Sequence, residues 1–79
     1  MPMITGAQLR MARAAVRLGV RDLARLAQIS PTTVTRAEAD LPVNKTVIAA
    51  IERALETAGI EFIPENGGGP GVRLKAKRQ

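Results

Sequence analysis

Hydrogen-bonding side chains are concentrated between Ser30 and Arg36 of this 79-residue sequence, where three threonines stand close together. Hydroxyl and guanidinium groups at this spacing can bind a polar surface through hydrogen bonds. Catalytic chemistry is poorly supported, because the chain has no histidine, cysteine or tyrosine and Ser30 is its only serine. A nucleophile and its base cannot be assembled in the usual way, so we expect a binding protein rather than an enzyme.

The same absences bear on cofactors and on the compartment. Without cysteine and histidine, the sequence predicts no disulfide, no metal site and no cofactor. The glycines at positions 67–69 lack the Lys-Ser/Thr of a phosphate-binding loop, and they predict a turn. No apolar run approaches the roughly 18 residues of a membrane span, and the first ten residues have no signal-peptide core. We therefore expect a cytoplasmic protein that does not bind membranes.

Positive charge is concentrated at the two ends of the chain. The formal net charge is +5, from 12 basic and 7 acidic residues. Residues 1–40 carry six arginines against three acids, residues 41–71 carry two basic groups against four acids, and residues 72–79 carry four basic groups. This distribution favours contact with a polyanion, although a solubilising excess of arginine would give the same sum. Phe62 is the only aromatic residue, which argues against stacking on single-stranded nucleic acid.

Four segments have the apolar periodicity of helices. Thr5 is the predicted cap of the first and Gly19 its stop, while Asn44 is the predicted cap of the fourth and Gly59 its stop. Ser30-Pro31 is a strong helix start, because serine accepts from free backbone N–H groups and proline fits the first helical position. The predicted helices cover residues 5–17, 20–27, 31–39 and 45–58.

The C-terminal segment changes period. Residues 60–63 and 72–74 have strand-like composition, and the turn-rich loop 64–71 lies between them. We expect a mainly α fold of four to five helices with a short C-terminal hairpin or strand pair. The predicted organisation is a helical domain over residues 1–59, a strand-loop-strand extension over 60–74 and a basic tail over 75–79.

Two short helices joined by the turn Gln28-Ile29-Ser30 make a helix-turn-helix over about residues 20–40. The stretch from Leu23 to Glu38 resembles the pattern Leu-Ala-x-x-Ala-Gly-Val-Ser-x-x-Thr-Ile-Ser-x-x-Glu of the XRE/Cro family of bacterial and phage repressors. With its flanking helices, the resemblance covers about residues 5–59 and implies a lambda-repressor-like domain that binds double-stranded DNA. The sequence departs from the family at Gln28, where glycine is common, and at Val20, where a phosphate-contacting glutamine is common. We expect Gln28 to cost about 1 kcal/mol in a left-handed turn conformation.

The resemblance also implies which residues meet the DNA. A guanidinium can bind O6 and N7 of guanine together, so Arg36 is the strongest candidate for reading a base, although a phosphate contact or a surface ion pair is the alternative. The expected base contacts are Pro31, Thr32, Thr33 and Arg36. The expected phosphate contacts are Ser30, Thr35, Asn44, Lys45 and Thr46.

A further pair of residues is implied to support the recognition helix. In the repressors that this sequence resembles, residues at the positions of Arg13 and Glu38 form a partly buried ion pair. The alternative is two unrelated surface charges.

The functional hypothesis is a transcriptional repressor that binds a near-palindromic operator as a homodimer. The dimer is expected to form through strands exchanged or paired between copies, since their apolar residues have no obvious place among the helices; these residues are Ile60, Phe62, Ile63, Val72 and Leu74. A hairpin folded back on its own fourth helix is the alternative. Two other functions stay open, an antitoxin-like protein that neutralises a protein partner and autoregulates, and nonspecific nucleoid or RNA binding.

Overall fold

The helices form where the sequence places apolar residues at helical spacing. The computed structural model describes residues 4–75. Within this range the chain forms four helices and a two-stranded antiparallel sheet, which confirms the predicted fold class. The elements are α1 (Gly6–Ala15), α2 (Val20–Ala27), α3 (Pro31–Glu38), α4 (Lys45–Thr57), β1 (Ile60–Ile63) and β2 (Gly71–Leu74). None of the described helices is long and apolar enough to cross a membrane.

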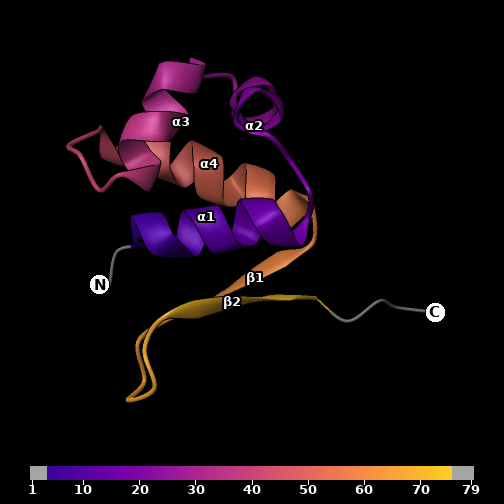
Figure 1. The fold of residues 1–79 in the computed structure, drawn as a ribbon, viewed down its shortest axis with the longest axis vertical. Helices are drawn as coiled ribbons and strands as arrows, with labels where there is room; N and C mark the ends of the chain where they lie inside the picture. The colour runs from indigo at the N-terminus through magenta and orange to yellow at the C-terminus, as the bar shows by residue number, and fades with distance from the viewer. Residues whose placement is uncertain (1–3, 76–79) are drawn as a thin grey trace.

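Three layers are visible in Figure 1: α2 and α3 lie at one end of the molecule, the hairpin lies at the other, and α1 and α4 lie between them. Nine apolar side chains from all four helices and β1 are buried together in one core. They are Leu9, Ala12, Leu23, Ala24, Val34, Ala37, Ile51, Leu55 and Ile60. Ala58, the last residue of the predicted fourth helix, lies one residue past the end of α4 and is exposed.

Side chains begin two of the helices as the sequence predicts. The Thr5 hydroxyl accepts a hydrogen bond from the Gln8 N–H, and the Gln8 side-chain oxygen accepts one from the Thr5 N–H. Ser30 accepts from the Thr33 N–H at 3.1 Å. The prediction for Asn44 is wrong in one respect, since Asn44 occupies the cap position of α4 but its side chain makes no capping hydrogen bond. Its side chain is therefore free for another contact.

Three helices end with a non-glycine residue in the left-handed conformation. Arg17, Gln28 and Asp40 have φ angles of 59°, 60° and 59°. After each helix, two successive N–H groups bond back to carbonyls of its last turns, as in the Schellman motif. The predicted stop at Gly19 is wrong, because α1 ends at Ala15, before the left-handed Arg17, and Gly19 is the cap residue of α2, its N–H donating to the Asp22 carboxylate. The left-handed strain expected at Gln28 thus recurs at two more junctions.

The hairpin packs on the helices of its own chain. Ile60 pairs with Leu74 and Phe62 with Val72, and Ile60 is fully buried in the core. The Gln8 side chain, itself buried, donates to the backbone carbonyls of Ile63 and Gly71 and so ties α1 to the sheet. The expectation that these strands have no place in the helical core is therefore wrong.

Apolar residues of both strands pack within the chain. Ile60 is fully buried, and Phe62 and Val72 pack against the same core. The role of these residues in dimerisation stays a prediction. The connecting loop is held by the Glu65 carboxylate, which accepts the N–H groups of Gly67 and Gly69. Residues 76–79 of the predicted basic tail lie outside the described residues.

The left-handed junctions give a matched set of substitutions. Glycine adopts positive φ without the steric penalty of a side chain, so Gln28→Gly should raise the free energy of unfolding by about 1 kcal/mol. Asp40→Gly should gain less or lose stability, because it also removes the carboxylate that accepts the Gly6 N–H at 2.8 Å. Urea denaturation of both variants makes the comparison. Equal gains at the two positions would show that the Asp40 hydrogen bond contributes nothing.

Candidate nucleic-acid interface

The turn between α2 and α3 is short and fully determined by local hydrogen bonds. Gln28 takes the left-handed conformation, and the Ile29 N–H bonds back to the Ala24 carbonyl at 3.0 Å. Ser30 then caps α3, whose first residue is Pro31. The two helices are therefore held at a fixed angle, with the start of α3 projecting from the end of the molecule opposite the hairpin (Figure 1).

One face of α3 is buried and the other is exposed. Val34, Ala37 and Glu38 are buried against the rest of the fold. The opposite face carries exposed side chains that can hydrogen-bond or make apolar contacts; they are Pro31, Thr32, Thr35 and Arg36. Because Thr32 and Arg36 are four residues apart, they lie on the same side of the helix. The structure thus brings together three of the four predicted base-contacting residues.

Thr33 differs from its neighbours. It is half-buried, and its hydroxyl lies 2.8 Å from the Ser30 hydroxyl while its N–H donates to the same oxygen. Ser30 and Thr33 are thus committed to capping the helix. Any contact with a ligand has to be made in addition to these hydrogen bonds.

Arg36 bridges the end of α3 to the loop that follows it. One amino group of its guanidinium donates to the Pro42 carbonyl at 3.1 Å, and the side chain stays exposed. A guanidinium has five N–H donors, so this bond leaves donors for a second acceptor. The hydrogen bond therefore orients the Arg36 side chain and leaves N–H donors of its guanidinium available to a ligand.

The start of α4 carries three of the residues predicted to contact DNA phosphates. Asn44, Lys45 and Thr46 are all exposed, and the backbone of Asn44 accepts the N–H groups of Val47 and Ile48. A helix start carries partial positive charge, and Lys45 adds a full one. The loop that contains Pro42 joins this helix start to α3, and Arg36 bonds to that loop.

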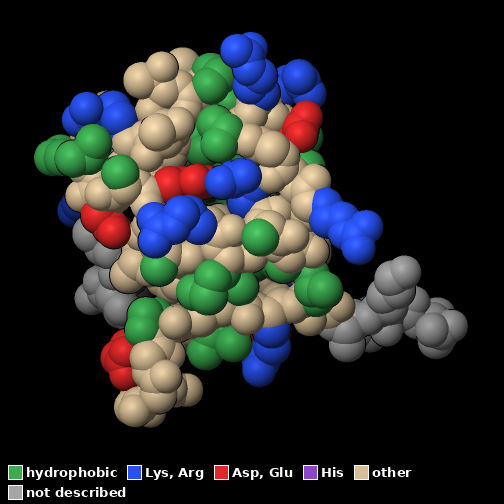
Figure 2. Space-filling view, viewed as in Figure 1, with side chains coloured by type: hydrophobic (Ala, Val, Ile, Leu, Met, Phe, Trp, Pro, Cys, Tyr) green, Lys and Arg blue, Asp and Glu red, His purple; other side chains and the backbone are tan. Residues whose placement is uncertain are grey.

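Basic side chains are not gathered into one patch on the face shown in Figure 2. Lys and Arg appear near α2, beside the hairpin and also in the middle of this face. On this face, charge by itself therefore does not mark an interface. The exposed side of α3 is distinguished by its geometry and its mixture of hydroxyl, apolar and guanidinium groups.

The structure places Arg13 and Glu38 together. Two parallel hydrogen bonds join them, from Nε to Oε2 at 2.7 Å and from Nη2 to Oε1 at 3.1 Å. The Glu38 side chain is 8% exposed and that of Arg13 24%. Hydrogen bonding to this carboxylate raises the pKa of Arg13, so the arginine stays charged throughout the accessible pH range.

Two more residues of α1 hold the same end of α3, and the sequence did not single them out. Arg10 donates from Nη1 to the Glu38 carbonyl. A Cβ placed on Gly6 would collide with the carbonyl oxygens of Glu38 and Ala37, so only glycine allows α1 and α3 to approach so closely. The one signal of this close approach in the sequence was the position of Gly6 in the first turn of a predicted helix, where glycine has poor helix propensity.

Comparison with known proteins gives one family. Residues 5–62 match a family model described as a helix-turn-helix domain, and the matched range contains α1 to α4 and most of β1. No curated protein matches the chain.

The close approach at Gly6 predicts a large effect from a single methyl group. Gly6→Ala should lower the free energy of unfolding by about 2 kcal/mol, since a backbone carbonyl cannot move aside as a flexible side chain would. Gly71→Ala is the matched control, because a Cβ there meets nothing within 4 Å. Thermal melting of both variants would show the difference, and equal melting temperatures would contradict the close contact.

The ion pair predicts a contrast with a second Arg–Glu pair. Arg13→Ala leaves the Glu38 carboxylate buried without its partner and should lower the free energy of unfolding by about 2 kcal/mol. Arg13→Met with Glu38→Leu should recover much of this loss, because no buried charge remains. Arg73→Ala breaks the pair between Arg73 and Glu61, which is also doubly hydrogen-bonded but exposed, and should change stability little. If chemical denaturation gave the same small loss in the free energy of unfolding for Arg13→Ala and Arg73→Ala, the Arg13–Glu38 pair would not be a stabilising feature.

Proposed function

The chain belongs to the helix-turn-helix domain family, and from that premise we propose that it is a sequence-specific regulator of transcription that binds double-stranded DNA. The observation that carries the proposal is the exposed side of α3, whose opposite side is fixed to the core and to α1. The major groove of DNA admits one helix, and base edges there differ in their donors, acceptors and methyl groups. A helix that presents threonines and an arginine can distinguish such edges.

In this proposal each exposed residue has a role set by its chemistry. Arg36 binds a guanine through the donors that Pro42 does not use, and Thr32 contacts a neighbouring base edge or a thymine methyl group. Pro31 and Thr33 complete the base-contacting set, Thr33 through its methyl group because its hydroxyl is shared with Ser30. Backbone phosphates are contacted by Ser30, Thr35, Asn44, Lys45 and Thr46.

The protein acts as a repressor of XRE/Cro type on a near-palindromic operator, as a homodimer in the cytoplasm. One recognition helix of eight residues reads only a few base pairs, which is too little for useful specificity. Two copies about 34 Å apart, one turn of the duplex, double the length of the site. The protein works by binding, without a catalytic step or a cofactor.

A second candidate function is antitoxin-like, in which the protein neutralises a protein partner and represses its own operon. The observation that favours it is exposed apolar surface outside the proposed base-contacting residues, at Met11 on α1 and at Leu41 in the loop that follows α3. A defined complex with one second protein, formed at micromolar concentration from purified components, would support this candidate.

The division between base and phosphate contacts predicts different consequences for two cations. Arg36→Ala should reduce discrimination between the operator and a singly substituted operator by about 1–3 kcal/mol. Lys45→Ala should weaken all duplexes alike and should lower the slope of log affinity against log salt by about 0.9. Fluorescence anisotropy titrations over a range of salt concentrations measure both quantities.

Arg73→Ala is the control for the loss of a positive charge, since β2 lies at the opposite end of the molecule from α3 (Figure 1). It should leave discrimination and salt dependence nearly unchanged. If Arg36→Ala weakened operator and random DNA equally, the assignment of Arg36 to a base would be wrong.

A further inference from the structure

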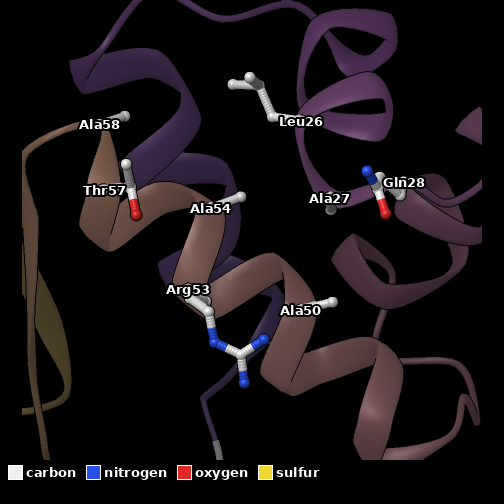
Figure 3. Close-up of a pocket in the computed structure, with 8 residues that line it drawn as sticks. All are labelled: Leu26, Ala27, Gln28, Ala50, Arg53, Ala54, Thr57 and Ala58. Atoms are coloured by element: carbon white, nitrogen blue, oxygen red, sulfur yellow. The ribbon is translucent and has the colours of Figure 1, made fainter.

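An open groove runs between α2 and α4, on a part of the surface that α3 does not line. It encloses about 410 Å³. Its floor is a row of small side chains, Ala50 and Ala54 on α4 and Ala58 directly after it, and its two walls carry Leu26 and Arg53 (Figure 3). The groove is therefore shaped to accept an apolar side chain of moderate size.

The Leu26 side chain stands beside this groove with 56% of its surface exposed. Its neighbours on α2, Leu23 and Ala24, are buried in the core, so Leu26 is not needed to fix the helix. Burial of a leucine side chain is favourable, and in the isolated chain this position forgoes most of that gain. A protruding leucine thus lines an open groove that has room for a second apolar side chain.

We propose that the groove is the contact surface between two copies of this chain, each of which inserts Leu26 into the groove of the other. A two-fold contact requires a self-complementary surface, in which a feature and its receptor lie side by side on the same molecule. Leu26 and the alanine floor satisfy that requirement. Each favourable contact is then made twice.

The charges on the two walls support a second copy as the occupant. Asp22 lies one turn before Leu26 on the same side of α2, with its side chain 50% exposed. One oxygen of its carboxylate lies 3.5 Å from Arg25 and the other accepts the Gly19 N–H, so a basic group of the second copy would share this carboxylate with Arg25. Arg53 is exposed on the opposite wall. When Leu26 of one copy enters the groove of the other, the acidic group beside it approaches the arginine on the far wall. The surface is thus complementary to itself in charge as well as in shape.

The hairpin is a weaker candidate for the same contact. Three of its apolar residues, Ile60, Phe62 and Val72, already pack within their own chain, and the outward face of the sheet carries the Glu61–Arg73 ion pair. The residues of α3 proposed to meet DNA line no part of the groove, so the contact between copies leaves them free.

Sedimentation velocity of the full chain without DNA tests the proposal. The proposal rests on the proposed function in one respect, that the protein acts as a homodimer. Wild type should dimerise, and Leu26→Lys should raise the dimer dissociation constant by roughly 100-fold, about tenfold for each of the two grooves. Leu74→Lys is the matched control, because Leu74 is 58% exposed on the hairpin, and it should leave the constant unchanged. A monomeric wild type, a dimeric Leu26→Lys, or dissociation by Leu74→Lys alone would overturn the proposal.

A cross-link keeps the proposal testable if Leu26→Lys fails to fold, and the chain has no cysteine to interfere. Thr57 also lines the groove, so Leu26→Cys chains mixed with Thr57→Cys chains should form a disulfide between the two chains under mild oxidation. Leu26→Cys mixed with Leu74→Cys should form it far more slowly. Equal rates in the two mixtures would also overturn the proposal. Because DNA is absent from both experiments, failure of DNA binding would leave their outcome unaffected, and the reverse holds as well.

Discussion

The carboxylate of Glu38 is the point at which α1 and α3 are joined. An isolated helix of eight residues is not stable in water, so the direction of α3 depends on what holds it. Arg13 binds the Glu38 carboxylate, Arg10 binds its backbone carbonyl, and Gly6 lets the two helices approach to backbone contact. These three residues occupy successive turns of α1. The buried side of α3 is thereby fixed, and its other side is left free.

The loop after α3 extends the same arrangement to the start of α4. Asp40 takes a left-handed conformation and accepts the Gly6 N–H, which anchors the loop to α1. Arg36 bonds to the Pro42 carbonyl two residues further along, so the loop in turn orients the guanidinium. The contacts that hold Glu38 against α1 and the contact that orients the Arg36 side chain are therefore connected through this loop.

Much of this fold could be predicted from the sequence, because the relevant signals are local. Apolar periodicity located the helices to within one or two residues, Ser30-Pro31 marked the start of α3, and the change of period at Ile60 marked the hairpin. The left-handed conformation of Gln28 was suggested by the family resemblance, because glycine is common at that position. The Arg13–Glu38 pair was suggested by the family resemblance and not by any pattern within the sequence itself.

What could not be predicted depends on contacts between distant parts of the chain. The place of Ile60 in the core follows from the docking of the hairpin on α1, which Gln8 secures through two backbone carbonyls more than fifty residues away. Gly6, Arg10 and Asp40 act only where α1 meets the end of α3. Left-handed conformations at Arg17 and Asp40 have no glycine to mark them, and they arise because each helix is turned sharply to meet the next.

The central claim is that the exposed side of α3 reads double-stranded DNA as part of a symmetric pair. Selection of bound sequences from random duplex DNA, with the full chain at a stated salt concentration, tests this claim most directly. The account predicts enrichment of a short motif present as two inverted copies, with centres about one helical turn apart. Recovery of sequences with no common motif would contradict it.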